Sequence, residues 1–529
     1  MGKSPPFLLF NEIEYSFQFT FYEIVLCEKL HFTKSFCVNI YILRNRDMIV
    51  VRSINMDKNI YLKRKIYDEF VNWNADPNKL PLIVDGLRQV GKSYIVNKFA
   101  NDNFENVITY DFRHNKELRK IFDGSLDVDS IVRNSTPYFT DKQFVPYKTI
   151  LIFEEIGDCP LARTSLKCFA QDKRYSVIAT GSLLGVLNYR KKAKIDIPTG
   201  YEKIIHMSSL DFEEFLWANG IDEKTIEVLK EYTHKKEQLP NALADFYKEM
   251  IKRYVVVGGM PDAVKAFLQT NNYIKSREIL EGLIRDYRAD FGRMINEKNE
   301  EVIDYKLQTQ LNQIFDSIPS QLARETDTHK FKYSEIKSGG RSTEFKEPFE
   351  WLEKAGLVLR CFNLTAIEKP LEANADNTSF KAFISDIGLL MAMYPLSSSQ
   401  EFLRDELESG KGAIFENLMA TMINKAGLPL YYFSRGSDHL EIDYIFESDK
   451  GITLLEEKST NGKMTASRLV MEGKTAYAAE ACYKVIKENF GEGDFYISVP
   501  QYAAPFLLSE IVDNLHKGTI LGPLNYPEL

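Results

Sequence analysis

The stretch LPLIVDGLRQVGKS (residues 80–93) decides the fold of the N-terminal half of this chain. It begins with a short apolar run that ends in Asp-Gly, which is typical of a buried β-strand. The following GLRQVGKS fits G-x-x-x-x-G-K-[ST] at every fixed position, and helical sequence begins at Lys92. A strand, this loop and a helix in that order are the context that identifies a phosphate-binding P-loop.

The chemistry of phosphate binding explains the spacing of this loop. Backbone N–H groups of the loop and of the helix N-terminus point at phosphate oxygens, and glycine lets the chain approach them closely. Lys92 is expected to reach the β- and γ-phosphates, and Ser93 to supply a hydroxyl to Mg²⁺. For Arg88 two roles stay open, pairing with an acid or reaching nucleotide in a neighbouring subunit. We predict that ATP and Mg²⁺ bind at Gly86, Leu87, Arg88, Gln89, Val90, Gly91, Lys92 and Ser93.

An apolar strand that ends in carboxylates is expected after a P-loop, facing the metal and the attacking water. KTILIFEEI (148–156) supplies it, with Glu154 and Glu155 at its end. We predict that Glu154 binds Mg²⁺ and that Glu155 is the catalytic general base. Because the usual first acid is Asp, the longer Glu154 predicts slow turnover even where ATP binds tightly. The alternative is an acidic strand end that faces solvent.

The next apolar strand, within YSVIATGSL (175–183), ends in Thr180 and Ser182. A polar side chain at this place can sense the γ-phosphate, so both residues join Lys92 and Glu155 as candidate catalytic residues. The alternative is that they only cap the following helix. Since such strands alternate with helical or loop sequence, we predict an α/β fold with a parallel sheet covered on both faces.

Five motifs in this order resemble a prokaryotic family of AAA-type P-loop ATPases that carry a C-terminal domain of unknown function. They are GLRQVGKS, LIFEEI, IATGSLLG, HMSSLDFEEFL (206–216) and VVVGGMPDAV (255–264), and the resemblance covers roughly residues 56–529. The family pattern has Asp-Glu where this chain has Glu154-Glu155, and commonly an Arg near Tyr201. Both departures imply inefficient hydrolysis.

The resemblance and the pattern of elements together predict five segments. They are an N-terminal extension or misassigned start (1–55), a P-loop AAA-type ATPase core (56–206), a helical lid (207–300), a winged helix-turn-helix region (301–395) and a restriction-endonuclease-like α/β domain (396–529). The winged helix is implied by the resemblance. The sequence supports it with a Gly339-Gly340 turn and a helix bearing Phe345, Phe349 and Leu352. Lysines and glutamates are mixed there, so DNA binding and a protein-interaction role both stay open.

The C-terminal segment HLEIDYIFESDKGITLLEEKSTNGK (439–463) resembles the restriction-endonuclease-like core, whose signature is an Asp on one strand and E-x-K on the next. A four-residue turn pairs Glu447 with Ile452 and brings Asp443 opposite Glu456, with Cβ atoms about 5 Å apart. We predict that Asp443 and Glu456 bind a divalent metal, aided by Lys458 and by Glu416 from the preceding helix. The alternative is a solvated hairpin on which acids and a lysine alternate.

Composition limits the functions open to the chain. Its 529 residues carry a formal net charge of −8, which argues against a protein that coats nucleic acid. The six cysteines are scattered without metal-ligand spacing, as expected of reduced thiols in a cytoplasmic protein, and no apolar run is long enough to span a membrane. Two functions follow: an ATPase coupled to a DNA-binding or nuclease-like module, or an ATP-bound switch whose nuclease fold docks a partner. DNA, a protein partner and self-association all stay open.

Overall fold

The computed structural model describes residues 36–40, 51–55, 60–181, 200–295, 301–324, 330–337, 339–435, 440–458 and 462–517. The chain divides into two compact units, Met1–Ile60 and Tyr61–Leu529. In the first unit, strands β1 (Phe36–Ile40) and β2 (Val51–Asn55) pair antiparallel. The expected P-loop, lid, winged-helix and nuclease-like segments lie almost entirely in the second unit.

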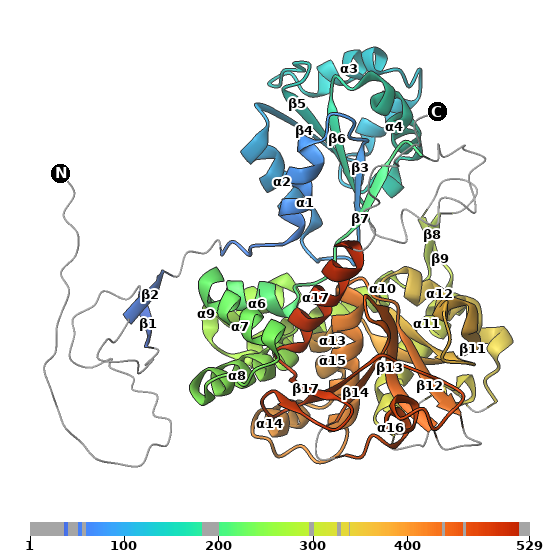
Figure 1. Cartoon of the computed structure of the whole chain (residues 1–529). Helices are drawn as coiled ribbons and strands as arrows, with labels where there is room; N and C mark the ends of the chain where they lie inside the picture. Colours follow the sequence, from blue (N-terminus) through green and yellow to red (C-terminus); the bar gives the residue numbers. More distant parts are fainter. Residues whose placement is uncertain are drawn as a thin grey trace, which may run out of the picture. The chain divides into compact units, whose positions relative to one another are not determined.

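The second unit begins with a five-stranded parallel sheet in the order β4-β5-β6-β3-β7 (Figure 1). Its strands are β3 (Leu82–Asp85), β4 (Asn106–Asp111), β5 (Thr149–Glu154), β6 (Ser176–Thr180) and β7 (Lys203–His206). The strand that precedes the P-loop therefore lies between β6 and β7. The α/β fold with a parallel sheet, predicted from the apolar runs, is confirmed.

Helices cover both faces of this sheet. Successive residues of a strand point to opposite faces, so the buried residues of these strands need packing partners on both. On one face an aromatic cluster that includes Phe112, Phe153 and Phe169 packs against α3 and α4. On the other face lies α2, which begins directly after the P-loop and packs against α1 through Phe70 and Phe99. The bounds are α1 (Ile66–Ala75), α2 (Lys92–Asn103), α3 (Val128–Ser135) and α4 (Pro160–Asp172).

A helical region follows the sheet, in the segment where a lid is expected. It comprises α6 (Phe212–Ala218), α7 (Glu223–Lys235), α8 (Asn241–Val257), α9 (Pro261–Thr270) and α10 (Tyr273–Asp290). Asp211 starts α6 with a capping box, since its carboxylate accepts from the backbone of Glu214 while the Glu214 carboxylate accepts from the backbone of Asp211. The Gly258-Gly259 pair separates α8 from α9.

The remaining chain builds a mixed eight-stranded sheet in the order β11-β10-β12-β13-β14-β15-β17-β16. Its strands are β10 (Val358–Leu364), β11 (Ala375–Ile384), β12 (Tyr431–Arg435), β13 (Leu440–Ser448), β14 (Gly451–Glu457), β15 (Ala481–Ile486), β16 (Gly491–Glu492) and β17 (Ile497–Pro500). The associated helices are α11 (Tyr305–Leu322), α12 (Ser342–Lys354), α13 (Ile387–Met393), α14 (Leu396–Leu403), α15 (Lys411–Lys425), α16 (Thr465–Met471) and α17 (Ala504–Lys517). A small hairpin, β8 (Arg293–Ile295) and β9 (Glu301–Ile303), precedes α11.

One sheet joins the two segments for which separate winged-helix and nuclease-like domains are expected. Strand β10 pairs antiparallel with β11 and parallel with β12, through Phe362 and Tyr431. The boundary expected between residues 395 and 396 therefore falls between strands of a single sheet. Sequence periodicity reveals each strand, but it does not reveal which distant strand each one pairs with.

Candidate functional site

Two glycines of the phosphate loop have backbone angles that favour glycine. Gly86 and Gly91 have φ angles of +143° and +93°. A Cβ atom at Gly86 would lie 2.2 Å from the carbonyl oxygen of Met207, so no larger residue fits there. The loop is thus packed against the chain that follows β7, while Gly91 caps the N-terminus of α2.

Lys92 lies buried inside this loop. Its ammonium group donates hydrogen bonds to the carbonyl oxygens of Gly86, at 3.1 Å, and Leu87, at 2.9 Å. Burial lowers the pKa of Lys92 to about 8, although the carboxylates of Glu155 and Asp85 oppose that shift. Lys92 is therefore a desolvated cation held at the loop, the position from which the motif predicts contact with phosphates.

Glu154, the first of the two acids expected at the end of this strand, is the last residue of β5 and lies beside the P-loop helix α2. The side-chain amide of Asn97 donates to Glu154 Oε1 at 2.9 Å. Burial raises the pKa of Glu154, and hydrogen bonds from Asn97 and Ser93 partly offset that effect. Glu154 therefore lies near the predicted metal-binding hydroxyl of Ser93.

Glu155 is held in an unusual conformation at the end of β5. Its φ angle is +53°, its backbone N–H donates to Thr180 Oγ1 at 3.4 Å, and its carboxylate pairs with the Arg113 guanidinium at 3.1 Å. Thr180 is buried at the end of β6. The structure thus joins Glu155 to Thr180 at the ends of the neighbouring strands β5 and β6, and the charge of Glu155 acts on Lys92 at the start of α2. Ser182 lies outside the described residues.

Helix α10 contacts the phosphate loop from the helical region. Arg88 pairs with Asp290, and the hydroxyl of Tyr287 donates to the Arg88 carbonyl oxygen at 3.0 Å. Arg88 thus pairs with an acid of the same chain, and its contact with nucleotide in a neighbouring subunit stays a prediction. Sequence reasoning missed Arg113, Asn97 and Tyr287, because their contacts with the site join distant parts of the chain.

The C-terminal acids and lysine also converge. Glu447 pairs with Ile452 and Tyr444 with Leu455, which confirms the expected hairpin register and brings Asp443 opposite Glu456. The Lys458 ammonium lies 2.9 Å from Asp443 Oδ2 and 2.8 Å from Glu456 Oε2. Burial raises the pKa of Glu456 to about 7, and the charge of Asp443 adds to the rise.

A second lysine, which is buried, lies at this acidic site. Lys381 of β11 donates to Glu416 Oε1 of α15 at 2.6 Å. Burial disfavours the charge of Lys381, but Glu416 and Asp443 outweigh it and raise its pKa. Within the described ranges, no cluster of three or more His, Cys, Asp or Glu residues is arranged to hold a metal ion. Metal binding by Asp443 and Glu456 stays a prediction.

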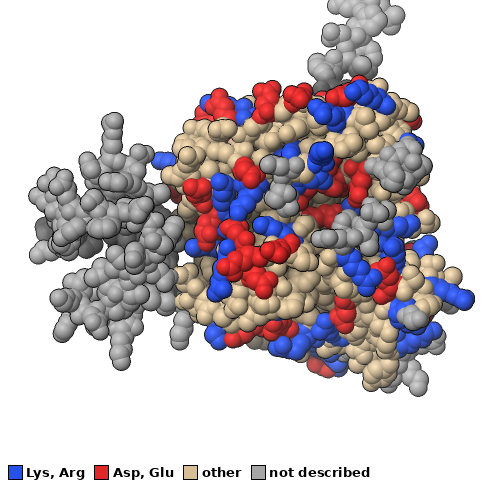
Figure 2. Space-filling view, turned by 90° about the horizontal axis from the view of Figure 1, so that it is seen from below, with Lys and Arg blue, Asp and Glu red and all other residues tan. Residues whose placement is uncertain are grey.

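The charges on one face of the molecule are mixed. Lys and Arg side chains interleave with Asp and Glu side chains over the described residues in Figure 2. Such a surface does not form the uniform basic field that binds nucleic acid by charge alone. Among the residues that the structure describes, no helix is long and apolar enough to cross a membrane.

Comparison with protein families identifies two regions. Residues 78–216 match the model of an AAA domain, and residues 248–400 match a domain of unknown function, DUF8612. The first region is a P-loop NTPase core. Its match to the AAA domain supports ATP binding, and the loop geometry agrees with it. No match was found among curated proteins.

Solved structures with similarity to the chain include a Walker-type ATPase and two ORC proteins. The Walker-type ATPase of Pyrococcus abyssi shares 13% identity over 63% of this chain and 96% of its own, with a TM-score of 0.37. The ORC2 protein of Aeropyrum pernix, solved in ADPNP-ADP complexes, shares 10% identity over 65% of this chain and 91% of its own, with a TM-score of 0.31. The ORC1 protein of the same organism, solved with DNA, shares 9% identity over 65% of this chain and 93% of its own, with a TM-score of 0.24.

Proposed function

We propose that the chain is an AAA-type ATPase that binds ATP with Mg²⁺ and hydrolyses it slowly. Two observations carry the proposal: Lys92 is buried at the start of α2, where the charge of Glu155 acts on it, and the Glu155 backbone is hydrogen-bonded to the Thr180 hydroxyl at the ends of β5 and β6. A buried cation, a carboxylate and a hydroxyl meeting beside a helix N-terminus suit phosphoryl transfer, which depends on placement and charge stabilisation.

Each residue has a distinct part in this proposal. The Lys92 ammonium would leave the loop carbonyls and pair with the β- and γ-phosphates. Ser93 and Glu154 would hold Mg²⁺, which neutralises phosphate charge when it is bound. Glu155 would accept a proton from the attacking water, and Thr180 would hold the Glu155 backbone through its hydroxyl. Ser182 keeps the sensor role predicted from sequence.

A second function, that of an ATP-bound switch, is favoured by the contacts that Glu154 and Glu155 make in this structure. The Arg113 guanidinium lies 3.1 Å from the Glu155 carboxylate and neutralises its charge. The side-chain amide of Asn97 donates a hydrogen bond of 2.9 Å to the Glu154 carboxylate. A base that is paired with a cation is a poor proton acceptor. In this state the chain would retain ATP without cleaving it.

The C-terminal half is proposed to act on DNA through a winged helix and a restriction-endonuclease-like fold. Its support is the convergence of Asp443, Glu456 and Lys458 on one face of the β13–β14 hairpin. Two carboxylates and a lysine so arranged suit phosphodiester cleavage once a divalent ion is present. In the switch alternative, the same fold would dock a protein partner or a second copy of the chain.

Steady-state phosphate release tests the two functions. An ATPase coupled to DNA releases phosphate continuously and changes its rate when duplex DNA is added. A switch binds ATP in calorimetry but releases about one phosphate or less per chain during the assay. If the purified chain with Mg²⁺ does not bind ATP, both proposals fail.

A further inference from the structure

The segment Met207–Leu210 lies within the motif HMSSLDFEEFL (206–216) and packs against the phosphate loop. The backbone N–H of Met207 donates to the Asp85 carbonyl oxygen at 2.8 Å, and its own carbonyl lies against Gly86. The Arg64 guanidinium connects this segment to the phosphate loop. It donates to the Ser208 carbonyl oxygen at 2.5 Å and to the Val90 carbonyl oxygen, inside the phosphate loop, at 3.0 Å.

The other end of the same segment is bound by residues from the C-terminal half. The hydroxyl of Ser209 donates to Asp386 Oδ2 at 2.7 Å, and Asp386 is fully buried. The ammonium of Lys425 donates to Ser209 Oγ and to the Leu210 carbonyl oxygen, each at 2.9 Å. Residues Ser209 and Leu210 thus carry contacts from two helices, since Asp386 caps α13 and Lys425 ends α15.

Gly258 and Gly259, in the motif VVVGGMPDAV (255–264), allow the chain to pack closely against Leu210 and Gly388. The Gly259 backbone N–H donates to Asp386 Oδ2 at 2.9 Å, and a Cβ atom at Gly259 would lie 2.1 Å from the Leu210 carbonyl oxygen. A Cβ atom at Gly258 would lie 2.6 Å from the Cα atom of Gly388. Three separate stretches of chain therefore meet backbone to backbone, and side chains larger than hydrogen would force them apart.

We propose that Asp386 and Lys425 are positioning residues for the nucleotide site, because they fix the segment on which the phosphate loop rests. The inference rests on the proposed ATP binding and deepens it. Coupling between two sites is reciprocal, so ATP binding must in turn stabilise α13 and α15. Helix α15 also carries Glu416 of the acidic site, which gives nucleotide a physical route to that site.

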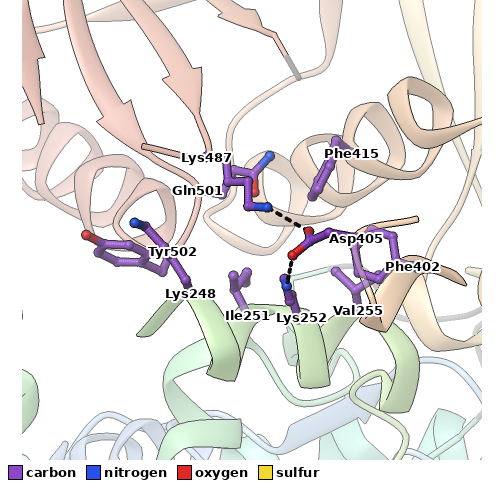
Figure 3. Close-up of a pocket in the computed structure, with 10 residues that line it drawn as sticks. All are labelled: Lys248, Ile251, Lys252, Val255, Phe402, Asp405, Phe415, Lys487, Gln501 and Tyr502. Carbon is purple, nitrogen blue, oxygen red and sulfur yellow. Dashed lines mark hydrogen bonds and ion pairs between the residues drawn. The ribbon is translucent and has the colours of Figure 1, made fainter. Parts of the chain in front are cut away.

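Calorimetric ATP binding to the whole chain tests this proposal. Ser209→Ala and Lys425→Met should each weaken ATP binding about fivefold or more, the lower range of typical coupling. Lys425→Arg, which keeps the charge and donors, should recover part of the loss. Asp405→Asn is the matched control, because Asp405 joins Lys252 of α8 to Lys487 beyond β15 (Figure 3). Neither of these ion pairs involves the segment Met207–Leu210. Its ATP affinity should equal that of the parent.

Hydrogen exchange of the unmodified chain gives a measurement that does not depend on whether variants fold. ATP should slow exchange at the amides of Gly388 and Leu389, which donate to Asp386 Oδ1. Unchanged exchange there, or parental ATP affinity in both Ser209→Ala and Lys425→Met, overturns the proposal. If the parent chain does not bind ATP, the proposed function itself is refuted. That result differs from a parent that binds ATP while both variants keep its affinity, which refutes only the positioning role.

Discussion

Glu154 of β5 accepts a hydrogen bond at 2.9 Å from the side-chain amide of Asn97, which lies one helical turn beyond Ser93 on α2. This contact ties the first acid of the strand to the helix that also carries the predicted metal-binding hydroxyl. A glutamate reaches that far because it is one methylene longer than aspartate. The added length therefore alters the position of the carboxylate where metal binding requires precise placement.

Glu154→Asp should raise the rate of ATP hydrolysis about tenfold, since the shorter side chain retracts from Asn97 toward the position usual for the metal-binding acid. Steady-state phosphate release at saturating ATP and Mg²⁺ measures the change. Glu154→Gln, which keeps the length and removes the charge, serves as the control and should lower turnover. A fall in rate with Glu154→Asp would mean that the site has adapted to glutamate.

Glu155→Gln should suppress hydrolysis about 100-fold or more while ATP still binds, because only the proton acceptor is lost. The comparison needs ATP affinity from calorimetry and turnover from phosphate release on the same preparation. Hydrolysis at the parental rate would show that another residue activates the water.

Arg113→Gln should increase turnover, because it removes the guanidinium that pairs with Glu155 at 3.1 Å. The variant reports whether this ion pair restrains the base or only stabilises the fold. Combining it with Glu155→Gln gives the control, since the gain must vanish when the carboxylate is absent. A gain that persists in the double variant would assign the effect of Arg113 elsewhere.

Lys92→Ala should weaken ATP binding at least about tenfold, the equivalent of one charge-assisted hydrogen bond to phosphate. The buried position of Lys92 means that the change also removes contacts with the loop carbonyls, so thermal unfolding must be followed in parallel. A folded variant with parental ATP affinity would contradict the P-loop assignment.

Local patterns made much of the fold and of the nucleotide site predictable. The P-loop, the apolar runs of β3 to β6 and the β13–β14 hairpin each depend on neighbouring residues, whose spacing the sequence displays directly. The hairpin register follows from the length of one turn, and the same register in the structure brings Asp443 and Lys458 together.

Contacts between distant parts of the chain were not predictable in this way. Asn97 and Glu154 are 57 residues apart, and Lys381 and Glu416 are 35 apart. No periodicity links such pairs, because the packing of a helix against a strand decides which side chains meet. The sequence does not reveal the pairing of β10 with β12 for the same reason, and its local patterns therefore favour a division of the C-terminal half into separate domains.

The shared sheet decides how the acidic site must be tested. A fragment beginning near residue 405 would lack β10 and β11, which are strands of the same sheet, and would lack Lys381. An unfolded fragment would bind no metal for reasons unrelated to the site. Metal binding must therefore be measured on the whole chain.

Asp443→Ala and Glu456→Ala should each weaken Mn²⁺ binding to the whole chain, because the Lys458 ammonium holds both carboxylates within one small region. Calorimetry without nucleotide isolates this site from the P-loop, and Glu447→Ala, on the same hairpin but bonded to the backbone of Leu371, is the matched control. Any DNA nicking by the parent with Mn²⁺ should disappear in both site variants and persist in the control. Loss of metal binding without parental nicking would favour a docking role, whereas equal Mn²⁺ binding by all four proteins would remove the nuclease-like site.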